Sequence, residues 1–182
     1  MPEIEYVEDR MESEELLERL CPPVRNWFKD KFPDFTEPQK VAIPRILNGE
    51  HLLLCSPTGS GKTLTAFLTI IDDLVRRSLD GSLPDAVQCV YISPIKALAN
   101  DIEKNLMGPL GEIKERYLPS RAKEIKVGLR TGDTPQSERE KMLRKPPHIL
   151  ITTPESLGLG LASKRFRPIL DQMKWFIIDE MH

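Results

Sequence analysis

Short apolar runs alternate with helix-like segments along most of the chain. The apolar runs of strand length lie at 51–55, 86–93, 125–130, 148–153 and 175–179. Helical spacing predicts helices between them, at about 61–80, 96–118, 135–145 and 155–171. Continuous apolar strands that alternate with helices are typical of a mainly parallel sheet covered by helices on both faces. The pattern therefore predicts a three-layer, doubly wound α/β domain.

Further helices are expected before the first strand. They cover 11–20, a segment that opens at Pro22-Pro23, and 36–50, with Thr36 as the N-cap. Residues 1–20 hold eight acidic and two basic side chains, whereas the remainder carries a net charge of +4. We therefore divide the chain into an acidic leader, partly helical or disordered, at 1–20 and one domain at 21–182.

Composition limits the classes of protein to consider. The net charge of −2 shows no global basic footprint of the kind that many nucleic-acid-binding proteins carry. Cys21, Cys55 and Cys89 are widely spaced beside or within apolar runs, so buried free thiols are expected rather than zinc ligands or disulfides. The sequence shows no signal peptide and no apolar stretch of membrane-spanning length. Together these features favour a cytoplasmic protein that does not bind membranes.

The octet SPTGSGKT at 56–63 lies between an apolar run and a predicted helix. Its two glycines allow backbone N–H groups to approach phosphate oxygens. Lys62 would then reach the β- and γ-phosphates of ATP, and the Thr63 hydroxyl would ligate Mg²⁺. An ordinary glycine-rich turn is the alternative, but it does not explain GKT at this place. The predicted nucleotide-binding residues of the octet are Ser56, Pro57, Thr58, Gly59, Ser60, Gly61, Lys62 and Thr63.

A second part of a nucleotide site is expected where the last apolar run ends. Asp179 follows this run and could hold Mg²⁺ through water. Glu180 could orient and deprotonate the attacking water. His182 completes a D-E-x-H pattern and is included, with Glu180 and Lys62, among the catalytic candidates. An Asp-Glu pair after a strand is often only the start of a loop. Here the predicted phosphate-binding octet at 56–63 precedes it, which favours a catalytic role.

Taken together, these blocks resemble a known family. SPTGSGKT and DEMH are similar to motifs I and II of superfamily 2 helicases of the DExH kind. The intervening blocks WFKDKFPDFTEPQ, SPIKALANDI, RTGDTP and PPHILITTPESL make the chain resemble the large helicase-related (Lhr) proteins of archaea and bacteria. The resemblance extends from about Cys21 to His182. It implies a RecA-like fold, in agreement with the α/β pattern.

The resemblance also assigns residues to adenine and to the nucleic-acid strand. Gln39 corresponds to the glutamine that reads adenine, and Phe28, or else Phe32, would stack on the base. The residues implied in strand contacts are Pro94, Lys96, Arg130, Thr131, Gly132, Thr153, Pro154 and Glu155. Helix N-termini and hydroxyl groups suit phosphate contacts. Without the family, Gln39 is a helix-surface residue and Thr-Pro-Glu is a favourable helix start.

The function implied is that of an ATP-dependent helicase motor, which couples ATP hydrolysis to movement on single-stranded or tailed DNA or RNA. The family has a strand with motif III between the P-loop strand and the Asp179 strand, and then a second RecA-like domain. Neither follows within the 182 residues. We therefore expect a longer protein, whose present residues bind ATP, Mg²⁺ and a strand but do not hydrolyse ATP alone. A binding module without turnover is the alternative; a P-loop ATPase that acts on something else does not explain the strand-contacting blocks.

Overall fold

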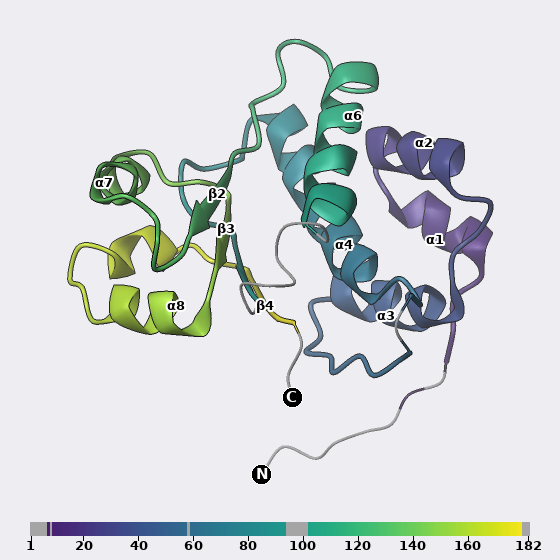
Figure 1. Ribbon diagram of the computed structural model, residues 1–182. Helices are drawn as coiled ribbons and strands as arrows, with labels where there is room; N and C mark the ends of the chain where they lie inside the picture. Colours follow the sequence, from purple (N-terminus) through teal and green to yellow (C-terminus); the bar gives the residue numbers. More distant parts are fainter. Residues whose placement is uncertain (1–6, 8, 58, 94–101, 180–182) are drawn as a thin grey trace.

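A single parallel sheet organises the part of the chain that can be described. The computed structural model describes residues 7, 9–57, 59–93 and 102–179. Its strands are β1 (Cys89–Ile92), β2 (Val127–Arg130), β3 (Ile149–Thr152) and β4 (Trp175–Ile178). They lie in the order β2-β3-β1-β4, and every pair is parallel (Figure 1). Four of the predicted strands are therefore confirmed.

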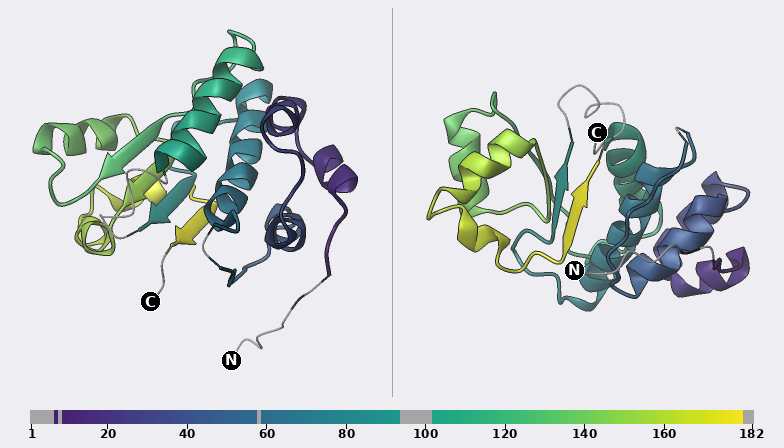
Figure 2. Two further views of the ribbon diagram at one scale, coloured as in Figure 1. Left: turned by 45° about the vertical axis from the view of Figure 1, so that its right-hand side comes forward. Right: turned by 90° about the horizontal axis from the view of Figure 1, so that it is seen from below.

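Helices cover both faces of this sheet. One face packs against α4 (Lys62–Asp80) and α6 (Gly108–Arg116), which follows a π-helical turn at Glu103–Met107. The other face packs against α7 (Gln136–Arg144) and α8 (Pro154–Leu161) (Figure 2). Alternate residues of the central strand β1 point into the two layers: Tyr91 contributes to the α4 side and Val90 to the α8 side. The predicted three-layer α/β fold is confirmed.

The N-terminal helices form an additional layer outside α4 (Figure 1). They are α1 (Ser13–Arg19), α2 (Pro22–Lys31) and α3 (Glu37–Leu47), which confirms the three helices predicted there. Asp72 of α4 is buried and joins this layer to α4, because it accepts a hydrogen bond from the Cys21 N–H (2.6 Å). Arg76, one turn later in α4, donates to the same carboxylate (2.7 Å) and to the Arg19 carbonyl. The layer is thus joined to the helix that begins at the P-loop.

Two predictions of secondary structure are wrong within the described residues, and the first part of the helix predicted at 96–118 lies outside them. Residues 51–55 form no strand, and Leu53 is 71% exposed, because this run has no hydrogen-bonding neighbour in the described sheet. The helix predicted at 155–171 is two pieces, α8 and a 3₁₀ turn at Arg167–Leu170. The chain turns between them so that the ring of Phe166 lies directly over Gly160, where a side chain would clash.

The cysteines follow from this arrangement. All three thiols are free, and Cys21 and Cys89 are buried as predicted. Burial raises the pKa of Cys21 to about 12 and also raises the pKa of Cys89, so both thiols stay protonated. Cys55 is exposed, contrary to the prediction, because its segment is not a strand of the sheet. Within the described ranges, every helix is too short or too polar to cross a lipid bilayer.

Candidate functional site

The P-loop adopts a turn that only glycine accommodates easily. Gly59 and Gly61 have φ angles of +78° and +86°, in the left-handed region. The hydroxyl groups of Ser56 and Ser60 are 2.6 Å apart, which closes the loop across its mouth. Gly61 is the N-cap of α4, so the loop delivers the chain directly to the positive end of a long helix. The local geometry suits an anion.

Lys62 and Thr63 form the first turn of α4, and both are half-buried. The Lys62 ammonium donates hydrogen bonds to the carbonyl groups of Ser56 and of Pro57 (2.8 Å). The side chain therefore folds back over its own loop, where phosphate oxygens would be its partners. Thr58, also predicted for this loop, lies outside the described residues.

Gln39 contacts the P-loop, although Gly61 lies 22 positions later in the sequence. Its Oε1 accepts the Thr36 N–H (2.9 Å) and caps α3, and its Nε2 lies 2.9 Å from the point that a Cβ on Gly61 would occupy. The Thr36 hydroxyl donates to the Ser60 carbonyl (2.9 Å). Gln39 is only 3% exposed. The start of α3 thus braces the P-loop, and the adenine-reading role of Gln39 stays a prediction.

Phe28, which was expected to stack on adenine, lies in the hydrophobic core. Its side chain is 2% exposed, and its ring stacks on Phe35 with centroids 4.0 Å apart. A ring that is packed in this way has no face to offer to adenine. Phe32, the alternative, is half-buried beside both Phe28 and Trp27. The aromatic residues of α2, Trp27 and Phe28, therefore belong to the hydrophobic core.

Asp179 follows β4, and its position is fixed on two sides. Its N–H donates to the Ile92 carbonyl (2.9 Å), which continues the pairing of β4 with β1. Its Oδ2 accepts a hydrogen bond from the hydroxyl of Tyr91, whose ring packs on Phe67 of α4 (centroids 4.9 Å apart). Asp179 and the P-loop helix therefore belong to the same end of the sheet. Glu180 and His182 lie outside the described residues.

The RTGD block (130–133) and the adjoining Thr134 form a loop, the RTGD loop, and one arginine donates to three of its carbonyl groups. Arg139 of α7 donates to the carbonyls of Thr131 (3.2 Å), Gly132 (2.7 Å) and Thr134 (2.8 Å). Arg130 turns away from this cluster, and its guanidinium lies 4.2 Å from the centre of the Phe166 ring. Burial and the charge of Arg139 lower the pKa of Arg130. The hydrogen bonds from Arg139 therefore hold the loop in a defined conformation.

The TTPE block (152–155) lies beside the RTGD block. The Thr152 hydroxyl donates to the Arg130 carbonyl (2.7 Å), and the two residues are partners in the β2–β3 register. Thr153 caps α8 by accepting the Ser156 N–H (3.3 Å), and Pro154 and Glu155 are exposed in the first turn. The strand ends thus bring together Arg130, Thr131, Gly132, Thr153, Pro154 and Glu155. Pro94 and Lys96 lie outside the described residues.

Sequence reasoning missed Tyr91 and Arg139, which position these groups. Tyr91 stands in an apolar strand, where a tyrosine is read as core, and its partner Asp179 lies 88 residues away. Arg139 is one of several charged residues in α7. No sequence signal separates it from a solvated arginine, because its contacts depend on how α7 packs beside the RTGD loop.

The donor set at Thr63 and Asp179 suits Mg²⁺. This ion is held in nucleotide sites by one or two protein oxygens, together with phosphate oxygens and several waters. One hydroxyl at the start of α4 and one carboxylate at the end of β4 are oxygen ligands of this kind. A site that coordinates an ion entirely through protein side chains is not needed here.

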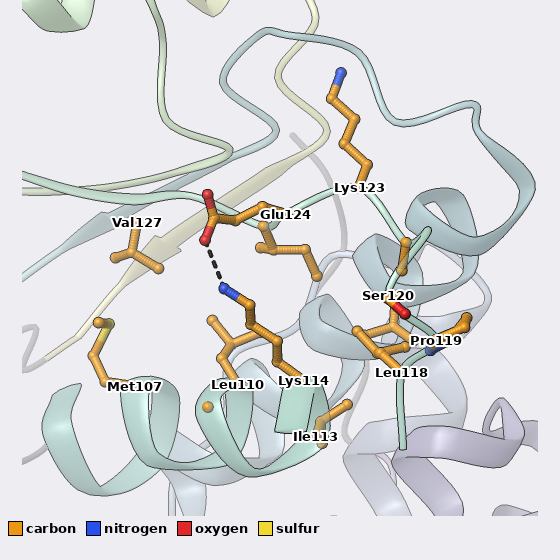
Figure 3. Close-up of a pocket in the computed structure, with 14 residues that line it drawn as sticks. Met107, Leu110, Ile113, Lys114, Leu118, Pro119, Ser120, Lys123, Glu124 and Val127 are labelled. Carbon is orange, nitrogen blue, oxygen red and sulfur yellow. Dashed lines mark hydrogen bonds and ion pairs between the residues drawn. The ribbon is translucent and has the colours of Figure 1, made fainter. Parts of the chain in front are cut away.

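A cavity of about 340 Å³ lies away from these groups, between α6 and the segment that leads into β2 (Figure 3). Its walls include Leu110, Ile113 and Val127, and the ion pair of Lys114 with Glu124 (2.7 Å) spans it. None of the predicted site residues lines it. The cavity is therefore distinct from the candidate site.

Known proteins match the chain over most of its length. The family model for the DEAD/DEAH box helicase matches residues 36–182. The ATP-dependent helicase Lhr-Core of Methanocaldococcus jannaschii is 47% identical, over 100% of this chain and 22% of that protein. The Lhr helicase/uracil glycosylase of Escherichia coli is 44% identical, over 90% of this chain and 11% of that protein. The chain thus spans about a fifth or less of the length of these relatives.

Solved helicase structures also resemble the chain. The structure of Mycobacterium smegmatis helicase Lhr bound to ssDNA and AMP-PNP has a TM-score of 0.78 and 44% identity, over 91% of this chain and 21% of that chain. The structure of Mss116p bound to ssRNA and AMP-PNP has a TM-score of 0.72 at 23% identity, which supports the fold alone. The described strands and helices are therefore those of a RecA-like domain.

Proposed function

The chain belongs to the DEAD/DEAH box helicase family, and from this premise we propose that it is the ATP-binding motor domain of an Lhr-type translocase. One observation carries the proposal. The start of the P-loop helix, Asp179, and the RTGD and TTPE blocks all lie at the carboxyl end of a parallel sheet. Ligands of open α/β sheets bind at this edge. A nucleotide and a strand would thus be held by adjoining loops.

The chain's own residues suggest how ATP is held. Lys62 exchanges the carbonyls of Ser56 and Pro57 for phosphate oxygens, so that its ammonium group keeps hydrogen-bond partners. Thr63 and Asp179 hold Mg²⁺, which when bound neutralises charge on the phosphates. Glu180 takes a proton from the attacking water. The N-terminus of the long helix α4, with its positive partial charge, faces the phosphates.

The nucleic-acid strand is proposed to follow the RTGD and TTPE blocks. Arg139 occupies three carbonyls of the RTGD loop, and the Thr131 N–H donates to the Thr134 hydroxyl (2.8 Å). Phosphates of the strand would then be bound by the other N–H groups of this loop. The exposed first turn of α8 offers a second helix N-terminus. Contacts of this kind read the backbone rather than the bases, so they suit both DNA and RNA.

We further propose that a second RecA-like domain of the same polypeptide completes the motor. The length of the relatives, about five times that of this chain, supports this proposal. The apolar Leu53, Phe176 and Ile178, which are exposed in the described residues, offer surface for further packing. A cytoplasmic location is proposed on the free thiols of Cys21, Cys55 and Cys89.

A binding experiment tests this function. Single-stranded DNA and single-stranded RNA with a fluorescent label are titrated with the full-length protein in the presence of AMP-PNP, and anisotropy is measured at several salt concentrations. Contacts to the phosphate backbone predict binding that weakens as salt rises. The logarithm of the binding constant should fall linearly with the logarithm of salt concentration. Absence of binding to either strand at low salt would contradict the proposed function.

Arg139→Ala should weaken strand binding about tenfold. Loss of the guanidinium leaves three carbonyls of the RTGD loop without their donor, and one hydrogen bond to a charged group is worth about 1.5 to 3 kcal/mol. Anisotropy with labelled single-stranded DNA measures the effect. Arg144→Ala is the matched control, since it removes the same charge from the same helix. Among the described residues, the side chain of Arg144 hydrogen-bonds the Glu140 carbonyl (3.4 Å) and not the RTGD loop. Equal affinities of the two variants would contradict the bracing role.

A further inference from the structure

Asp179 has a partner that the family motifs do not include. The carboxylate accepts a hydrogen bond from the hydroxyl of Tyr91, a residue of the neighbouring strand β1. The two strands are parallel, and Tyr91 is the register partner of Ile177. The phenol therefore extends along the sheet towards the residue just beyond β4. Strand pairing thus fixes the backbone of Asp179, and the phenol contacts its carboxylate.

The ring of Tyr91 is fixed, so its hydroxyl has a defined direction. Tyr91 is 2% exposed and belongs to the core beneath α4. Its ring packs against Phe67, which lies little more than one turn beyond Lys62 and Thr63. A buried ring that cannot rotate away holds its single polar atom at the boundary between core and site. Tyr91 thus connects the P-loop helix to the carboxylate across the sheet.

We propose that Tyr91 is a positioning residue, whose hydroxyl holds the Asp179 carboxylate in the orientation that receives Mg²⁺ with ATP; this inference rests on the proposed function. A carboxylate has about four sites that accept hydrogen bonds, so the phenol can orient the group while another of these sites accepts from water bound to the metal. Phenylalanine would fill the same space but supply no donor. Residues that orient metal ligands commonly change metal affinity 10- to 100-fold when they are replaced.

A merely structural tyrosine would give a different result from a positioning one. Loss of a structural hydroxyl would lower thermal stability and leave the Mg²⁺ dependence of nucleotide binding as it is. Loss of a positioning hydroxyl raises the Mg²⁺ concentration required, because the Asp179 carboxylate then samples other orientations. Nucleotide affinity without Mg²⁺ stays the same, since Lys62 and the P-loop backbone do not depend on the phenol.

The test is Tyr91→Phe in the full-length protein. A fluorescent ATP analogue is titrated in EDTA and at a series of Mg²⁺ concentrations. We expect unchanged affinity in EDTA and a roughly tenfold rise in the Mg²⁺ concentration that gives half of the maximal increase in affinity. Tyr117→Phe is the matched control, because its hydroxyl also donates to a carboxylate, that of the exposed Asp30. Its Mg²⁺ dependence should equal that of the unmodified protein.

The outcomes separate this inference from the proposed function. An unchanged Mg²⁺ dependence in Tyr91→Phe, with Mg²⁺-dependent binding by the unmodified protein, would overturn the role of Tyr91 alone. The same holds for an equal loss of affinity in EDTA and in Mg²⁺, which would mark a general structural defect. Failure of the unmodified protein to bind the analogue would overturn the proposed function and, with it, this inference.

Discussion

Lys62→Ala in the full-length protein should weaken ATP binding about 100-fold and abolish ATP hydrolysis. The variant removes the ammonium group that the P-loop now holds against the carbonyls of Ser56 and Pro57, at the start of α4. Charge-assisted contacts to phosphates worth about 3 kcal/mol correspond to a change of this size. Binding of a fluorescent ATP analogue, followed by a phosphate-release assay, measures both effects.

The control for Lys62→Ala is Lys114→Ala. Lys114 is an exposed lysine of α6, and its partner is Glu124, well away from the P-loop. This variant should bind and hydrolyse ATP like the unmodified protein. If Lys62→Ala keeps its ATP affinity, then the octet at 56–63 is only a glycine-rich turn.

Glu180→Gln should keep ATP binding and lower the hydrolysis rate by about 10²- to 10⁴-fold. Glutamine has the shape of glutamate but cannot take a proton from the attacking water, and general bases contribute rate factors of this order. Asp179, which precedes it, remains held by Tyr91 and by the Ile92 carbonyl, so the carboxylate proposed to hold Mg²⁺ keeps its place. Single-turnover hydrolysis and equilibrium ATP binding are measured on the same preparation.

Glu115→Gln provides the comparison for this variant. Glu115 is exposed on α6 and belongs to none of the site blocks. Its removal changes the net charge by the same amount, so any effect of charge alone would appear in both variants. Persistent turnover in Glu180→Gln would remove Glu180 from the role of base.

The sequence predicted the strands of the sheet where apolar runs were both continuous and paired. Val90 and Leu150 are buried by strands on both sides and helices on both faces, so their runs carry a strong signal. The run at 51–55 carries a similar signal, yet it forms no strand, since a strand also needs a hydrogen-bonding neighbour. Apolar pattern alone does not contain that information.

In the site, too, the sequence predicts features that the local chain determines, but not contacts that depend on tertiary packing. Gly59 and Gly61 have the positive φ angles that the P-loop pattern implies, because a loop of fixed length sets them. Phe28 was expected at adenine but packs on Phe35 in the core, since aromatic spacing on a helix does not distinguish the two uses. The partners of Asp179 and of the RTGD carbonyls could not be predicted, because tertiary packing alone brings them together.

The most direct test of the motor assignment is the ATPase rate of the full-length protein, titrated with single-stranded DNA and with RNA at fixed salt. A motor whose nucleotide and strand loops share one edge of the sheet should hydrolyse ATP faster as the strand binds. Stimulation by either nucleic acid is the predicted result, and the stronger stimulation identifies the preferred strand. ATP binding without stimulation by either nucleic acid would contradict the account and favour a binding module without turnover.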